Sequence, residues 1–92
     1  MEMTKHATDR LQQRAIPFLI VEWLFSYGAR ERSQERSVII FFDRKSKKRL
    51  KHAVGARIVN LLGPVLDAYI VIDSDTRRVI TAGHRFKRIK HA

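Results

Sequence analysis

The chain contains no cysteine, and this absence removes several classes of site at once. Disulfide scaffolds, thiolate zinc sites, iron–sulfur clusters and cysteine nucleophiles all need that residue, so we expect a protein of the reducing cytoplasm. Glycine and proline are also scarce, with four and two residues, which argues against a disordered or low-complexity chain. The default expectation is a packed globular protein.

Long apolar runs are absent as well. The longest, Ala15 to Phe25, is interrupted by Glu22 and is well short of the roughly 20 residues that a transmembrane helix requires. No small-residue cleavage site follows this run, so we expect no secretory signal peptide and no membrane partner. A chain of 92 residues has room for one core, and we expect a single domain over residues 1–92.

Acidic residues are few in the second half of the chain, and the formal net charge is +10. Up to Asp43 the basic and acidic residues cancel, whereas from Arg44 onward thirteen Lys and Arg oppose three Asp. This asymmetry favours a polyanionic partner, because neutralised phosphates release counterions and basic surfaces attract them at long range. Nucleic acid is the leading interpretation, and a solvated basic face or a surface for an acidic protein are the alternatives.

The first half of the chain predicts two helices and a strand. Thr4 to Arg14 has a small apolar stripe and a threonine cap, and Pro17 to Tyr27 is apolar on nearly all sides and stops at Gly28. Ala29 to Arg36 alternates charges without an apolar stripe, so we expect an exposed connection. Ser37 to Asp43 is a β-branched and aromatic run, which predicts a buried strand.

The second half predicts a basic helix and a hairpin. Apolar residues recur at helical spacing in Ser46 to Leu62, which Gly63 and Pro64 terminate. Ala68 to Asp73 and Arg78 to Gly83 read as strands joined by a turn, which favours antiparallel pairing. We therefore expect an α+β fold in which two N-terminal helices pack on a small, mainly antiparallel sheet.

Residues suited to proton transfer and phosphate binding lie near both ends of the chain. His6, Arg10 and Arg14 are spaced at i, i+4 and i+8 and share one face of the first predicted helix. Thr81 and His84 lie at the exit of the last predicted strand, followed by a basic segment. Each set alone is also compatible with an ordinary solvated surface. Together the two sets favour a functional site if folding brings the two ends of the chain into contact.

Metal-independent RNA cleavage needs this inventory. A base removes the 2′-hydroxyl proton, an acid protonates the departing 5′-oxygen, and cations hold the negatively charged phosphorane. His6 and His84 are the candidate proton carriers, because the pKa of imidazole lies near neutral pH. Arg10, Arg14 and Arg85 are the candidate phosphate clamps, because guanidinium binds two phosphate oxygens at once.

Other basic residues are expected to follow the RNA backbone rather than to take part in the chemistry. The candidate nucleic-acid-binding residues are Lys47, Lys48, Arg49, Lys51, Arg85, Lys87 and Arg88.

Competing chemistries are less well supported. Asp73 and Asp75 flank a serine where a hairpin turn is independently expected, so we expect no metal there, and the histidines lack zinc-ligand spacing. No glycine-rich phosphate loop or nucleophile elbow occurs, and we expect no cofactor. Phe41, Phe42 and Tyr69 lie inside apolar runs, which favours core positions over base stacking.

Two short patterns resemble the domain of unknown function 4258, which is similar to the RelE-like toxins and to the wider fold class of barnase, EndoU and colicin nucleases. The helical pattern H-x-x-x-R-x-x-x-R-x-I is matched by His6, Arg10, Arg14 and Ile16, and the strand–turn–strand pattern by Tyr69 to Asp73 and Val79 to Thr81. The resemblance implies two N-terminal helices flanking an antiparallel sheet, often with RNA cleavage as the activity.

The sequence therefore predicts a toxin-like, metal-independent endoribonuclease with RNA as substrate. Such a toxin needs an inhibitor, so we expect an acidic antitoxin or immunity protein as a partner, and the apolar second helix allows a homodimer. Two other classes remain open, namely a catalytically inert nucleic-acid- or ribosome-binding module and an interaction protein that docks an acidic partner.

Overall fold

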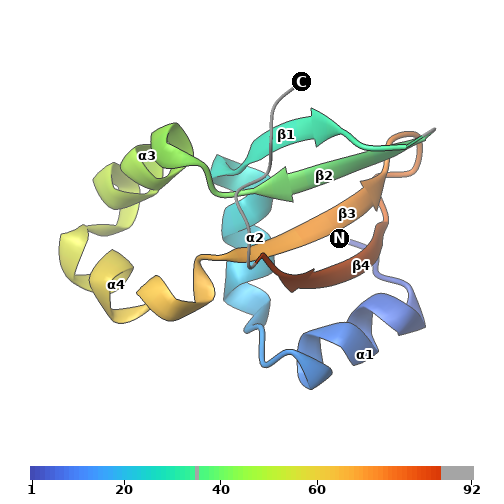
Figure 1. Ribbon diagram of the computed structural model, residues 1–92, viewed down its shortest axis with the longest axis horizontal. Helices are drawn as coiled ribbons and strands as arrows, with labels where there is room; N and C mark the ends of the chain where they lie inside the picture. Colours follow the sequence, from blue (N-terminus) through green and yellow to red (C-terminus); the bar gives the residue numbers. More distant parts are fainter. Residues whose placement is uncertain (35, 86–92) are drawn as a thin grey trace.

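The computed structural model describes residues 1–34 and 36–85 and shows an α+β fold in which two N-terminal helices precede an antiparallel sheet, as expected (Figure 1). The elements are α1 (Lys5–Gln13), α2 (Phe18–Tyr27), β1 (Ala29–Arg32), β2 (Ser37–Phe41), α3 (Arg44–Val54), α4 (Ala56–Leu61), a 3-10 turn (Gly63–Val65), β3 (Ala68–Asp73) and β4 (Val79–His84). The strands pair in the order β1-β2-β3-β4, each antiparallel to the next.

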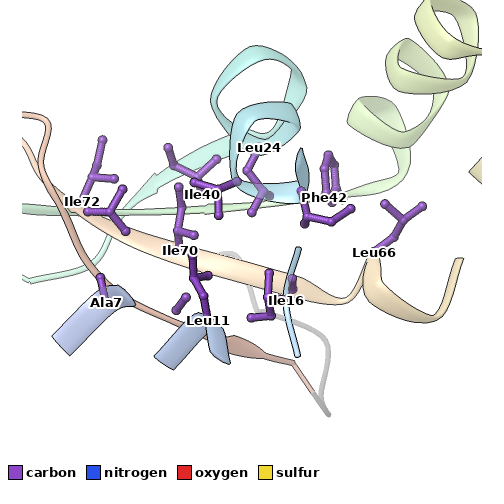
Figure 2. Close-up of a cluster of buried hydrophobic side chains, with 14 of the residues drawn as sticks. Ala7, Leu11, Ile16, Leu24, Ile40, Phe42, Leu66, Ile70 and Ile72 are labelled. Atoms are coloured by element: carbon purple, nitrogen blue, oxygen red, sulfur yellow. The ribbon is translucent and has the colours of Figure 1, made fainter. Parts of the chain in front are cut away.

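Both N-terminal helices pack into one core with the sheet. Ala7 and Leu11 form the buried stripe of α1, and the fully buried Leu24 comes from α2. The sheet contributes Ile40 and Ile70, which are directly opposite each other in β2 and β3. Figure 2 shows these side chains in one cluster. Because each fully buried aliphatic side chain stabilises the fold by about 1.5–3 kcal/mol, this cluster fixes the helices on the sheet.

Backbone hydrogen bonds fasten the beginning of the chain to its last described strand. The Thr4 amide donates to the Val79 carbonyl at 3.0 Å, and the Val79 amide donates to the Glu2 carbonyl at 3.0 Å. The Thr4 hydroxyl accepts from the Ala7 amide, which caps α1, and donates to the Ile80 carbonyl at 3.1 Å. The cap of α1 is therefore also its attachment to β4, and the two distant parts of the sequence lie side by side (Figure 1).

The end of α2 at Gly28 was expected, but the reason for the glycine differs from the usual one. Gly28 has φ −67°, so a left-handed conformation is not involved. A Cβ atom there would lie 2.6 Å from the Cγ2 of Ile40 and 2.6 Å from the Leu24 carbonyl oxygen. The glycine is required because helix and strand approach closely where α2 turns into β1.

The expected exposed connection from Ala29 to Arg36 is wrong, because Ala29–Arg32 forms strand β1. Its side chains alternate between half-buried and exposed, with Arg30 and Arg32 on the exposed positions. A strand at the edge of a sheet commonly carries charges, which discourage pairing with another chain. The alternation of charge was therefore the pattern of an edge strand and not of a loop.

The single helix expected over Ser46–Leu62 is also wrong, because the segment contains two helices that meet at Gly55. Gly55 has φ +96°, a conformation that ends α3 and that other residues rarely adopt. Helix α3 starts earlier than expected because Asp43 caps it. Its carboxylate accepts from the Ser46 amide at 2.8 Å, while the Ser46 hydroxyl accepts from the Asp43 amide at 2.7 Å. The hydrogen bond from the Ser46 amide is the main reason why the pKa of Asp43 lies below its usual range.

Candidate functional site

A pocket of about 180 Å³ lies where α1 meets β4, and we call it the α1–β4 pocket. Its lining residues are Arg10, Arg14, Tyr69, Thr81, Ala82, Gly83 and His84. The structure thus brings together Arg10, Arg14, Thr81 and His84, which are four of the five residues for which the sequence suggested a catalytic role. They come from opposite ends of the described chain.

Helix α1 presents its two arginines to this pocket because its other face is committed to the core. Ala7 and Leu11 are buried against the sheet, and Arg10 and Arg14 lie one turn apart on a different face. Arg10 is half-buried and Arg14 is exposed. Two guanidinium groups at this spacing give the pocket a positive charge suited to a phosphate.

Strands β3 and β4 supply the other wall. Tyr69 and Gly83 are directly opposite each other, and a Cβ atom on Gly83 would lie 2.9 Å from the Tyr69 hydroxyl oxygen. The glycine therefore leaves room for the tyrosine ring to cross β4 toward the pocket. We expected Tyr69 in the core, but it is half-buried. The alternation of AYIVID, in which Ile70 and Ile72 are buried, already placed it on the opposite face of the sheet.

His84 is held by two hydrogen-bond acceptors. Its Nδ1 lies 2.6 Å from Oδ1 of Asp67, and its Nε2 lies 2.7 Å from the Arg14 carbonyl oxygen. A neutral imidazole has only one N–H, so both contacts are satisfied together only by the imidazolium. Burial lowers the pKa of His84, but the hydrogen bonds to Arg14 and Asp67 outweigh it and raise this pKa above its ordinary value.

The position of Nε2 has a second consequence, because Arg14 is the residue that caps the C-terminal end of α1. The final carbonyl groups of a helix lack partners within the helix and carry partial negative charge. Cationic His84 donates to one of these carbonyls and so caps α1 from another part of the chain. The same contact places the imidazolium at the rim of the α1–β4 pocket.

Asp67 is a member of the site that the sequence reasoning missed. It directly precedes β3, and its carbonyl oxygen accepts from the Arg85 amide at 2.9 Å. Ala68 pairs with His84, so the hairpin register places Asp67 beside the end of β4. The signal was available in the expected pairing of the last two strands, because the residue before one strand of a hairpin lies near the end of the other.

His6 does not line the pocket. It is exposed on the first turn of α1, where the Nε of Arg10 donates to its Nε2 at 3.5 Å. Eight residues separate it from Arg14, which corresponds to about 12 Å along a helix axis. His6 and His84 therefore share the α1 side of the molecule, but only His84 lies at the pocket.

Arg85 does not line the pocket either, because its side chain packs across the sheet. The guanidinium lies 4.8 Å from the centre of the Phe41 ring and donates to the Phe42 carbonyl at 2.8 Å. Burial lowers the pKa of Arg85, against the opposing effect of nearby carboxylates. This arrangement covers Phe41, which is 1% exposed. The predicted RNA-binding residues Lys87 and Arg88 lie outside the described residues.

The basic residues of α3 form a separate surface, which we call the α3 surface and define by the exposed residues Arg44, Lys45, Lys47, Lys48, Arg49 and Lys51. Figure 1 shows α3 projecting from the sheet well away from α1. Arg49 donates to the Tyr27 carbonyl at 3.1 Å, which ties the helix to the end of α2. The α3 surface therefore does not contribute to the α1–β4 pocket.

The charges of α3 repel one another. Lys47 and Lys51, like two further pairs in this helix, are like charges at i and i+4, and each such pair destabilises a helix by about 0.2–0.5 kcal/mol. Within residues 1–34 and 36–85, no ion pair involves α3. Such a concentration of positive charge attracts a polyanion.

Within the described part of the chain, no group of three or more histidine, aspartate or glutamate side chains is placed to hold a metal ion. The helices of that part are all too short or too polar to cross a lipid bilayer. Comparison with protein-family models, curated proteins and solved structures finds no match to this chain. The resemblance to the domain of unknown function 4258 rests on two short patterns that no family-model match supports, so it stays a prediction.

Proposed function

We propose that this chain is a metal-independent endoribonuclease and that the α1–β4 pocket binds the scissile phosphate. The observation that carries the proposal is the meeting of two arginines, a threonine hydroxyl and a carboxylate-held imidazolium in one small pocket. A volume of about 180 Å³ is below the range of about 300–1,000 Å³ typical of pockets for whole small molecules. It suits one phosphate group of a longer substrate.

Each group has a role in the cleavage step. The 2′-oxygen of the ribose attacks phosphorus as the bond from phosphorus to the 5′-oxygen breaks, and Arg10 and Arg14 hold the negative charge that develops. His84 donates its Nε2 proton to the departing 5′-oxygen, which replaces the Arg14 carbonyl as its partner. Asp67 is a positioning residue, because it holds Nδ1 and so directs Nε2 toward the rim.

The 2′-hydroxyl proton needs an acceptor on the other side of the phosphate. The two candidate acceptors are Nε2 of His6, which lies beside Arg10 outside the pocket, and the hydroxyl of Tyr69 in the pocket wall. His6→Ala and Tyr69→Phe distinguish them, because only loss of the true acceptor lowers the rate of cleavage at every substrate concentration.

In this proposal the α3 surface binds a part of the RNA backbone at a distance from the cleaved bond. A net charge of +10 also suits an acidic inhibitor, so we propose an acidic antitoxin or immunity protein as the partner of a cytoplasmic toxin. Induced expression then arrests growth of host cells, and co-expression of an acidic inhibitor restores it.

The test is incubation of the purified protein with a mixed-sequence RNA in EDTA. Cleavage is expected to persist in the chelator and to fall about 100-fold or more in His84→Ala. His52→Ala is the matched control, because this histidine is exposed on α3 and outside the pocket. Absence of cleavage by the wild-type protein, or equal loss in both variants, contradicts the proposal.

A second candidate function is RNA binding without cleavage, and one observation favours it. Both ring nitrogens of His84 already have partners inside the protein, which is the arrangement of a histidine that caps a helix. A binding module predicts salt-sensitive RNA affinity that His6→Ala leaves unchanged and no cleavage product at any enzyme concentration. The same RNA incubation therefore separates the two functions.

A further inference from the structure

A second and larger pocket, of about 310 Å³, lies at the hairpin end of the sheet and shares no residue with the α1–β4 pocket. We call it the hairpin pocket. Its lining residues are Arg30, Glu31, Arg32, Val38, Ile72, Ser74 and Arg77. The residues come from β1, β2, β3 and the turn between β3 and β4. Its volume lies at the lower end of the range for whole small-molecule ligands, about 300–1,000 Å³.

Three arginines, Arg30, Arg32 and Arg77, line the hairpin pocket. Partial burial and then the charge of Arg77 lower the pKa of Arg30, so the two guanidiniums act on each other. Arg30 is fixed in place by donation to the Phe25 carbonyl at 3.0 Å. Arg77 has φ +61° in a turn closed by its amide, which donates to the Asp73 carbonyl at 2.8 Å. Local structure therefore holds two mutually repelling cations at one concavity.

Glu31 also lines the hairpin pocket. In β1 successive side chains point to opposite faces of the sheet, so Glu31 starts from the face opposite to Arg30 and Arg32, and the arginines outnumber this one carboxylate among the lining residues. An anion placed between the guanidiniums relieves their repulsion, and a phosphate matches the paired N–H groups of each.

The floor of the hairpin pocket is apolar. Val38 and Ile72 are directly opposite each other in β2 and β3 and face the same side of the sheet as the core. Ile72 is 2% exposed and Val38 is half-buried, so Val38 supplies the apolar surface that a ligand can contact. An apolar surface beneath a cationic rim matches a ligand with one flat apolar part and one anionic part. Inorganic phosphate alone leaves the floor uncovered.

We propose that the hairpin pocket binds a nucleotide, with its phosphate between Arg30 and Arg77 and its base against Val38. The site is independent of the cleavage reaction, because none of its residues lines the α1–β4 pocket. The ligand is either a free nucleotide or a nucleotide within an RNA strand, since both present the same chemical groups.

The test is calorimetric titration of the full chain with AMP, adenosine and inorganic phosphate. AMP is expected to bind more tightly than either part alone. Arg77→Asn is expected to weaken AMP binding about tenfold or more, since it removes a charge-assisted hydrogen bond. Asparagine tolerates the positive φ at this position.

Arg78→Asn is the matched control, because it removes the same charge from the neighbouring exposed residue, which does not line the pocket. Equal weakening by Arg77→Asn and Arg78→Asn, or equal affinity for AMP and adenosine, overturns the proposal. Val38→Ala gives a second readout, because it is expected to weaken AMP binding and to leave phosphate binding unchanged.

Competition distinguishes the two sources of the ligand. Displacement of AMP by a short single-stranded RNA identifies the site as part of the RNA path, whereas retention of AMP identifies a free nucleotide. The readout is binding and not cleavage. Failure of the endoribonuclease proposal therefore leaves this result intact, and the reverse also holds.

Discussion

Nδ1 of His84 lies 2.6 Å from Oδ1 of Asp67, which joins the last residue of β4 to the residue before β3. With Nε2 bound to the Arg14 carbonyl, this one side chain connects the hairpin to the end of α1. The imidazole side chain is 19% exposed and the Asp67 side chain 40%, so solvent screens this contact in part. Stability, pocket geometry and the proposed acid therefore depend on the same proton.

Stability is expected to fall as pH rises from about 6.5, the ordinary pKa of histidine, through the higher pKa that His84 has in the fold. Because the folded-state pKa is raised, the contribution of His84 is fully present below the unfolded-state value and is lost above the folded-state value. Urea unfolding of the wild type and of His84→Gln at pH 5.5 and 8.5 measures the contribution of His84 to the free energy of unfolding. The difference between the two proteins is expected to be larger at pH 5.5, and a difference independent of pH contradicts the assignment.

Asp67→Asn is expected to lower RNA cleavage and to move its pH profile. Asparagine removes the negative charge that holds the imidazolium, so the pKa of His84 falls and the acid loses its proton at a lower pH. The loss of activity on the alkaline side therefore shifts to lower pH, which a merely structural defect does not cause. Asp75→Asn is the control, because its carboxylate pairs only weakly with exposed Arg36. An unshifted profile in Asp67→Asn argues against its positioning role.

Much of the fold follows from local patterns in the sequence. Thr4 caps α1, the apolar α2 packs in the core, and the last two strands form the expected hairpin. These features depend on neighbours in the sequence. The edge strand β1 was harder to foresee, because exposed charges that alternate along a short segment are also typical of loops. Its pairing with β2 shows that this segment is a strand and not a loop.

The candidate site was only partly predictable for a similar reason. The helical spacing of Arg10 and Arg14 is visible in the sequence, and so is the position of His84 at a strand end. Asp67 lies at the site because of the strand register, which brings it to His84. Arg85 does not lie at the site, because its side chain crosses the sheet to Phe41. Long-range geometry of this kind has no local signature in a single sequence.

Gly28→Ala is expected to destabilise the fold by about 1–3 kcal/mol, the range for overpacking a tight interior. The added Cβ would approach the Ile40 side chain and the Leu24 carbonyl oxygen to 2.6 Å, and one of them is backbone that cannot turn aside. Gly63→Ala is the control, because a Cβ there meets nothing within 4 Å. Thermal or urea unfolding measures both variants, and equal stability of the two would show that helix and strand separate at little cost.

The double variant Lys47→Ala/Lys51→Ala is expected to bind single-stranded RNA more weakly. The slope of log affinity against log salt concentration is expected to become shallower by about 1.4, because each phosphate contact contributes about 0.7 to this slope. It is also expected to be slightly more stable, because it removes a like-charge pair and introduces better helix formers. The control Lys5→Ala/Arg78→Ala removes the same charge from exposed residues outside α3 and both pockets. Binding at several salt concentrations, with urea unfolding alongside, measures both effects. If the control reduces the slope equally, net charge and not the α3 surface binds the RNA.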